Sequence, residues 1–174
     1  MRTYTKILAT TVVLAAAGWF AGCNGTYDKE PNVVLEVKTL TITPITGATD
    51  PVSGACIFTI TNATASFDNK PKNALAVESP ANDIILRDVL VGYTWDDLTG
   101  ATAAQFGVGG TVTANGSGTG QFAVVNAQDL AVPSREGHTA SLTLTFRGVT
   151  VSGDPVSVTT GGSLTVNTCP PVAP

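Results

Sequence analysis

The chain has 174 residues, of which 43% are hydrophobic and 13% are charged, and its formal net charge at pH 7 is −4. This length is typical of one domain of ordinary size. Nine basic residues are scattered among thirteen acidic ones, so the sequence contains no basic stripe for binding nucleic acid or anionic lipid.

The first segment has the order of a secretory signal. Arg2 and Lys6 supply positive charge, residues 7–20 are mostly apolar, and the small residues Ala21 and Gly22 follow. The apolar stretch is too short to span a bilayer comfortably. The sequence therefore predicts a signal for export in residues 1–22.

The residues Phe20-Ala21-Gly22-Cys23 resemble the lipobox of bacterial lipoproteins, with Phe20 in the place of the usual leucine. The resemblance implies that the Cys23 thiol receives diacylglycerol, that the chain is cut before Cys23, and that the new amino terminus is acylated. Two or three fatty chains would hold a small domain on a membrane almost permanently. Asn24 stands where an aspartate would signal retention, so the resemblance favours the outer membrane of the bacterial cell envelope. The alternative is a plain secretory signal cut at another small residue, with Cys23 an ordinary thiol.

Residues 23–32 are predicted to form a lipidated tether, because Asn24–Asn32 is polar and lacks the apolar residues that a packed core needs. Removal of the 22 leader residues from 174 would leave 152, with seven basic and thirteen acidic side chains and a net charge of −6. We expect these residues to form one β domain over residues 33–174.

From Val33 onward, runs rich in Val, Thr, Ile and Leu alternate with clusters of Gly, Pro, Asn and Asp, which is typical of short antiparallel strands. The pattern predicts an all-β domain, a β-sandwich of about seven strands, with a barrel as the alternative architecture. The predicted strands are 33–43, 55–67, 83–95, 105–113, 120–126, 140–151 and 156–166.

Side chains two positions apart along a strand point to the same face. In three of these runs, however, two successive apolar residues are three positions apart. A slip of one residue predicts a bulge or a crossing between sheets. The intervals are Val37 to Leu40, Leu86 to Val89 and Phe146 to Val149. The pairs Gly109-Gly110 and Gly161-Gly162, inside β segments, likewise predict bends or bulges.

Two loops predict hairpins between antiparallel neighbours. Asn115–Gly120 is expected to be a flexible hairpin loop, and Ser152–Pro155 a tighter one.

The segment Phe67–Asn73, followed by Ser79–Ile84, resembles one that recurs in uncharacterised bacterial lipoproteins with a single immunoglobulin-like sandwich. The resemblance extends over residues 55–95. It implies an antiparallel immunoglobulin-like β-sandwich in an exported setting, and it implies no activity. Physically, the segment is a proline-punctuated crossover that can link strands of opposite sheets.

Two cysteines remain after Cys23, and an oxidising exported location favours their pairing. Cys56 shares its parity with Phe58 and Ile60, which places it on the buried face of its strand. We therefore expect a disulfide between Cys56 and Cys169, which would contribute on the order of 4 kcal/mol in the chain-entropy model. The alternative is two free thiols.

The sequence contains little material for catalysis. His138 is the only histidine, Ser134 is the nearest hydroxyl upstream, and no Gly-x-Ser-x-Gly elbow is present. One histidine with two paired cysteines falls short of a zinc site. We therefore expect neither an enzyme nor a cofactor.

Four neighbouring residues are the candidates for a small-ligand site. Asp96 and Asp97 could offer carboxylates to calcium, although aspartate is also ordinary turn chemistry. Tyr93 and Trp95 could offer aromatic faces to a sugar, although they share parity with Val89 and Val91, which favours the core.

Two classes of function follow. The favoured hypothesis is a lipid-anchored envelope or surface domain without catalysis, with a structural role or a protein or polymer partner. The alternative is a lipoprotein that binds a small ligand, a sugar or calcium. Exposure of Trp95 beside a cleft would favour the alternative, and burial of Trp95 would favour the first hypothesis.

Overall fold

The computed structural model describes residues 31–73, 79–97, 103–126, 130 and 135–170. The predicted signal (1–22), Cys23 and most of the predicted tether lie outside the described residues. The described residues belong to the unit that begins at Pro31. In the part of the chain that is described, no helix is long and apolar enough to cross a membrane.

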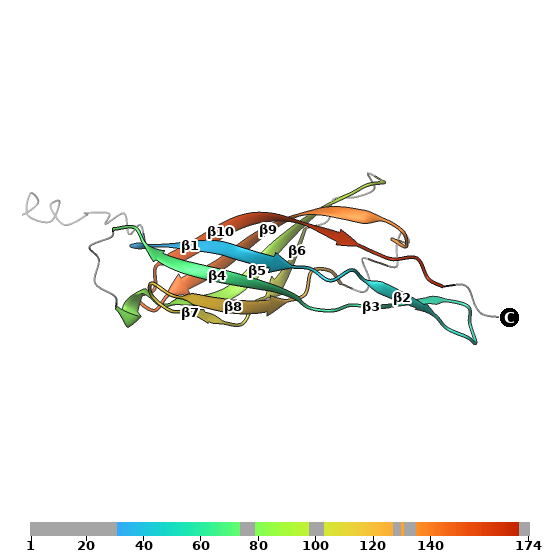
Figure 1. Ribbon diagram of the computed structural model, residues 1–174, viewed down its shortest axis with the longest axis horizontal. Helices are drawn as coiled ribbons and strands as arrows, with labels where there is room; N and C mark the ends of the chain where they lie inside the picture. Colours follow the sequence, from blue (N-terminus) through green and yellow to red (C-terminus); the bar gives the residue numbers. More distant parts are fainter. Residues whose placement is uncertain (1–30, 74–78, 98–102, 127–129, 131–134, 171–174) are drawn as a thin grey trace, which may run out of the picture. The chain divides into compact units, whose positions relative to one another are not determined.

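The unit is all-β, and its named strands pair antiparallel in three sheets (Figure 1). The small sheet has the order β1 (Val33–Thr41), β4 (Ala63–Pro71), β8 (Ser117–Phe122). The large sheet has the order β10 (Pro155–Thr165), β9 (Thr139–Thr150), β5 (Ile84–Trp95), β6 (Ala103–Gly107), and β7 (Thr111–Val112) pairs with the start of β5. The strands β2 (Thr46–Thr49) and β3 (Cys56–Thr59) form a separate two-stranded hairpin, and the 3-10 helix η1 covers Pro80–Asn82.

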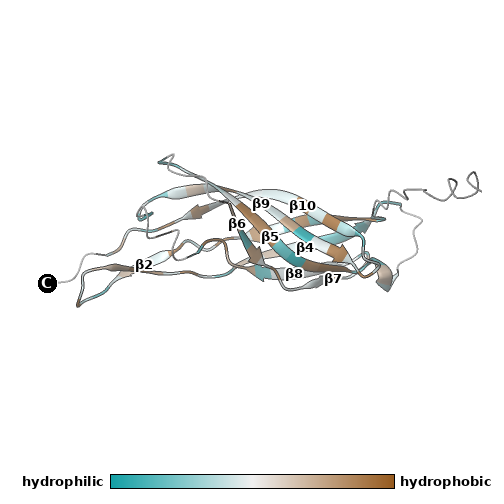
Figure 2. Ribbon diagram, turned by 180° about the vertical axis from the view of Figure 1, so that it is seen from behind, coloured by the Kyte–Doolittle hydropathy of each residue, from teal (hydrophilic) through white to brown (hydrophobic). Residues whose placement is uncertain are grey.

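One hydrophobic core lies between the two larger sheets. It forms because inward positions alternate with outward ones along each strand, as the hydropathy of β5 shows in Figure 2. Phe146 of β9 meets Phe67 of β4 and Phe122 of β8 edge to face, with ring centroids 4.9 and 5.1 Å apart. Aromatic contacts across the two sheets are consistent with a β-sandwich.

Two of the three predicted phase slips are confirmed as bulges. The register shifts between Val37 and Thr39 in β1, and between Leu86 and Asp88 in β5. The slip predicted after Phe146 is wrong, because β9 keeps its register through Gly148. Gly148 itself occupies the buried position, where a Cβ would stand 2.7 Å from the carbonyl oxygen of Ile85.

Of the two predictions for glycine pairs, one is confirmed and the other is wrong. Gly109-Gly110 does interrupt the chain between β6 and β7, and Gly110 has φ 153°. Gly161-Gly162 was expected to form a bend or bulge, but β10 pairs with β9 through both residues without a register shift. That expectation is therefore wrong.

The described residues contain ten strands, so the expected number of about seven is too low. The predicted run 55–67 divides into β3 and β4, and the run 105–113 divides into β6 and β7. β2 was not predicted as a separate strand. Short apolar runs look continuous in sequence, but their two halves pair with different neighbours in space.

One predicted hairpin is confirmed and the other is wrong. Ser152–Pro155 connects β9 to β10 tightly, and Thr150 N–H donates to the Asp154 carbonyl at 2.9 Å. In contrast, the loop before β8 passes from the large sheet to the small one, because β7 pairs with β5 and β8 with β4. Its turn includes Asn115 at φ 51°.

Candidate functional site

The two aromatic candidates for a sugar platform lie in the core. Tyr93 and Trp95 are each 3% exposed, and their rings stack with centroids 6.4 Å apart. The Tyr93 hydroxyl donates to the Val124 carbonyl at 2.6 Å, which satisfies the phenol inside the core. Neither ring presents a face to solvent, so the parity argument for burial is confirmed.

A buried arginine covers Trp95. The guanidinium carbon of Arg135 lies 4.6 Å from the Trp95 ring centroid, a cation–π contact. Its Nη1 lies 2.9 and 3.1 Å from the two carboxylate oxygens of Asp97, and the Arg135 side chain is only 5% exposed. Arg135 is one of the basic residues scattered along the sequence, which were expected on the solvated surface, so its burial corrects that expectation; nothing close to it in the sequence signals the contact.

The second calcium candidate, Asp96, is also engaged by protein groups. Its carboxylate accepts the Thr139 N–H at 2.9 Å and lies 2.7 Å from Nδ1 of His138. The Thr139 N–H, and after it the His138 ring, hold the pKa of Asp96 below its ordinary value. Asp96 and Asp97 therefore bind different partners, and both join the end of β5 to the segment that leads into β9.

His138 is part of this connection as well. Its ring pairs with Asp96, while Ser134, the hydroxyl considered as its catalytic companion, lies outside the described residues. The geometry assigns the His138 and Asp96 pair a role in holding the start of β9 beside the end of β5.

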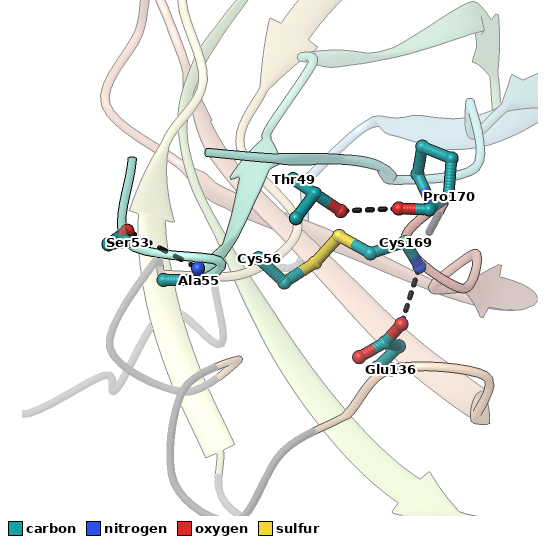
Figure 3. Close-up of a disulfide and its surroundings, with 7 residues drawn as sticks. All are labelled: Thr49, Ser53, Ala55, Cys56, Glu136, Cys169 and Pro170. Atoms are coloured by element: carbon teal, nitrogen blue, oxygen red, sulfur yellow. Dashed lines mark hydrogen bonds between the residues drawn. A yellow bond between two sulfur atoms is a disulfide. The ribbon is translucent and has the colours of Figure 1, made fainter. Parts of the chain in front are cut away.

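The structure joins Cys56 and Cys169, 113 residues apart, in the disulfide that the sequence suggested (Figure 3). The bridge attaches the β2–β3 hairpin to the carboxyl-terminal segment. Glu136 accepts the Cys169 N–H, and the Thr49 hydroxyl donates to the Pro170 carbonyl on either side of it. Cys56, Cys169 and Glu136 are close enough to suggest a metal site, but the two sulfur atoms are bonded to each other.

The accessible feature is a groove between two strand edges. β1 and β10 lie side by side at the edges of their sheets (Figure 1). Ile45, beyond β1, forms a parallel bridge with Val166, its N–H donating to Thr165 and its carbonyl accepting from Asn167, both at 2.9 Å. No backbone hydrogen bond joins β1 to β10 themselves among the residues described.

Two hollows mark this β1–β10 groove, one toward each end. The first, of about 280 Å³, is lined by Leu40, Ile42 and Gly161–Ser163. The second, of about 270 Å³, is lined by residues 31, 33–35, 72 and 155–157. The sequence did not suggest the groove, because it depends on two strands more than a hundred positions apart.

A third hollow, of about 270 Å³, lies on the outer face of the small sheet beside Lys38, Asp68 and Lys70. Its charges are already paired, since Lys38 lies 3.6 Å from Asp68 and Lys70 contacts Glu36. The two hollows of the β1–β10 groove, in contrast, are lined mainly by uncharged residues.

Comparisons with known proteins add no identification. No family model matches the chain, and no curated protein matches it. Among solved structures the chain is similar to the solution structure of AT1g01470 from Arabidopsis thaliana, at 12% identity and a TM-score of 0.35. That alignment covers 83% of this chain and 91% of the other, and a similarity this low carries no argument about function.

Proposed function

We propose that the chain is a lipoprotein of the bacterial cell envelope, anchored at the outer membrane through Cys23. Its β domain serves as a structural or interaction module that binds another envelope or surface protein or polymer, without catalysis and without a cofactor. The lipobox-like residues Phe20–Cys23 support the anchor, and the scarcity of basic residues argues against a nucleic-acid partner.

The burial of Trp95 is the observation that carries the choice between the two hypotheses. A ligand site at this end of β5 would need Tyr93, Trp95, Asp96 and Asp97 to face a cleft. Instead the rings are buried and the carboxylates bind Arg135, Thr139 and His138. The described surface includes strand edges to which a partner could bind, and such edges are typical of interaction modules.

The strand order supports an immunoglobulin-like sandwich. The order β1-β4-β8 corresponds to strands A, B and E of that fold, and β10-β9-β5-β6 corresponds to G, F, C and C′. The β2–β3 hairpin is an addition between the first two strands of the small sheet. Its disulfide joins the hairpin to the carboxyl-terminal segment, unlike the antibody bridge that spans the two sheets.

Metabolic labelling with a palmitate analogue in the bacterial host tests the anchor. The wild-type chain should be labelled and Cys23→Ala should not. The matched control is the double variant Cys56→Ala/Cys169→Ala, which removes the other thiols and should keep the label. Equal labelling of wild type and Cys23→Ala would overturn the anchor.

Crosslinking in the same host tests the interaction role. We expect one envelope protein or polymer to be captured reproducibly, and the purified pair to bind again in isolation. Absence of any reproducible partner that binds again would contradict the interaction role.

A further inference from the structure

The edge strand β10 bonds to β9 with one side of its backbone, and among the described residues only Thr165, at its end, has a backbone bond on the other side. Val166 N–H donates to the His138 carbonyl at 2.9 Å, which continues the pairing of even-numbered residues with β9. Thr165 O and Asn167 N, in contrast, bond to Ile45 on the opposite side. Because backbone groups alternate along a strand, the odd-numbered residues of β10 direct their N–H and C=O groups toward the β1–β10 groove.

Within the described part of the chain, four successive odd-numbered residues have no backbone partner in that groove. Among the described residues, none hydrogen bonds to the backbone N–H or C=O of Ser157, Thr159, Gly161 or Ser163, and all four residues are exposed. Their N–H and C=O groups recur every two residues, about 6.6 Å apart. The backbone of an extended polypeptide has the complementary spacing of donors and acceptors.

Gly161 is a second, independent indication that another backbone could approach β10 closely. Gly162 is explained by packing, because a Cβ there would stand 2.9 Å from Ile42 Cδ1 and 3.1 Å from Leu40 Cδ2. At Gly161, however, the nearest atom to a Cβ would be the Leu142 carbonyl oxygen at 3.8 Å, and the strand has no bulge there. A glycine that weakens a strand without a packing reason is typical of a place where another backbone approaches.

The charge of the edge restricts the partner. β10 has no charged residue over its 11 positions, although the whole chain has a net charge of −4. Edge strands are usually protected from pairing by lysine, proline or a bulge, and β10 has only Pro155 at its first position. An uncharged edge matches an uncharged strand, because a charge in the middle of the partner would lose water without gaining an ion pair.

The two hollows restrict the side chains of the partner. One hollow adjoins Ser157 and the other adjoins Gly161, four positions further along β10. Four positions of extended strand span about 13 Å, and residues i and i+4 lie on the same face of a strand. A partner strand with apolar side chains at i and i+4 would place one in each hollow.

We propose that the free edge of β10 binds an extended, uncharged segment of a partner protein by β-strand addition, with apolar side chains four positions apart in the two hollows of the β1–β10 groove. The proposal rests on the interaction role proposed above and specifies its surface and its partner chemistry.

The test begins with the purified full chain and a displayed library of random decapeptides. Peptides selected on the chain are synthesised and measured by fluorescence anisotropy, and we expect uncharged centres with apolar residues at i and i+4. Thr159→Pro should weaken binding at least tenfold, because proline removes the N–H that faces the groove and leaves the bonds to β9. The matched control Thr159→Ala keeps that N–H and should change binding less than twofold.

A second pair of variants keeps every backbone N–H. Gly161→Lys places a charge at the edge and should also weaken binding at least tenfold. Thr143→Lys places the same charge on the exposed residue of β9 that pairs with Gly161, and it should bind like wild type. Melting curves verify that all four variants fold. Amide hydrogen exchange should show new protection of the odd-numbered N–H groups of β10 when a selected peptide binds.

Three results would overturn the proposal. The library could yield no binder, or the selected peptides could bind Thr159→Pro and Gly161→Lys as tightly as wild type. Light scattering could instead show a dimer that Thr159→Pro abolishes, which would assign the edge to a second copy of the chain. In each case a partner captured by crosslinking in the host would leave the broader interaction role intact, so the two failures are distinguishable.

Discussion

Gly47 lies directly against the disulfide sulfur of Cys169. A Cβ on Gly47 would stand 2.5 Å from the Cys169 Sγ and 2.7 Å from the Cys56 Sγ, so the disulfide fills the space that a side chain would need. Gly47 pairs with Phe58 across the β2–β3 hairpin. Because an isolated two-stranded hairpin is marginally stable, this contact with the bridge and the carboxyl-terminal segment helps to hold the hairpin in place.

Gly47→Ala should therefore destabilise the protein by about 1–3 kcal/mol and leave a measurable fraction of free thiol, because the added methyl group displaces the sulfur atoms. Chemical denaturation and thiol titration measure the two effects. Gly107→Ala is the matched control, since a Cβ at Gly107 would meet nothing within 4 Å. Equal stability of the two variants would contradict the packing argument.

Removal of the disulfide in Cys56→Ala/Cys169→Ala should lower the free energy of unfolding by about 4 kcal/mol, because the bridge closes a long loop in the unfolded chain. Urea denaturation measures the loss. Wild type with a thiol reductant should behave like the double variant, and the reductant should have no further effect on the variant. A loss well below 1 kcal/mol would show that the bridge contributes little to folding.

Arg135→Ala should destabilise the protein by about 2–4 kcal/mol, because the Arg135 side chain is only 5% exposed, and its loss breaks a buried ion pair with Asp97 and opens a cavity over Trp95. Thermal and urea unfolding measure the change. Arg147→Ala is the control, because Arg147 bonds Asp88 at 2.6 Å with its side chain 42% exposed, and its loss should cost about 0–1 kcal/mol. A similar cost for both variants would contradict the importance of burial.

The Asp96 carboxylate should make stability depend on acid pH. Its pKa in the folded protein is lowered below the ordinary 3.8, first by the Thr139 N–H and then by His138. Its contribution is therefore fully present above about pH 4 and is lost as the pH falls through the folded pKa. Asp96→Asn should be less stable than wild type at pH 7, and the difference should shrink below pH 3.8. A difference that is constant with pH would contradict this assignment.

The fluorescence of Trp95 tests the ligand alternative. In the chain cut before Cys23, Trp95 is the remaining tryptophan, and its 3% exposure predicts weak quenching by acrylamide. Mono- and oligosaccharides should leave both the spectrum and the quenching unchanged. A saturable shift with a sugar would favour the small-ligand alternative over the interaction role.

Much of the sandwich could be predicted because it depends on local periodicity. The alternation around Val89 and Val91 placed Tyr93 and Trp95 inside, and the apolar intervals after Val37 and Leu86 located two bulges. These features depend on which face of a strand each side chain points to, and the alternation of side chains along a strand follows directly from the sequence. The bulge predicted after Phe146 is wrong because Gly148 occupies the inward position, and a buried glycine does not stand out as an apolar residue in the sequence pattern.

The order of the residues is enough to predict an all-β domain and the alternation that forms its core, and the lipobox-like signal at Cys23 stays a prediction. The burial of Arg135 against Asp97, 38 positions away, becomes visible only in the folded chain, as does the division of β7 and β8 between different sheets. The fold also leaves one side of β10 without a partner strand among the described residues. These outcomes depend on which distant segments pack together. A local pattern of residues does not reveal the free energy of such long-range contacts.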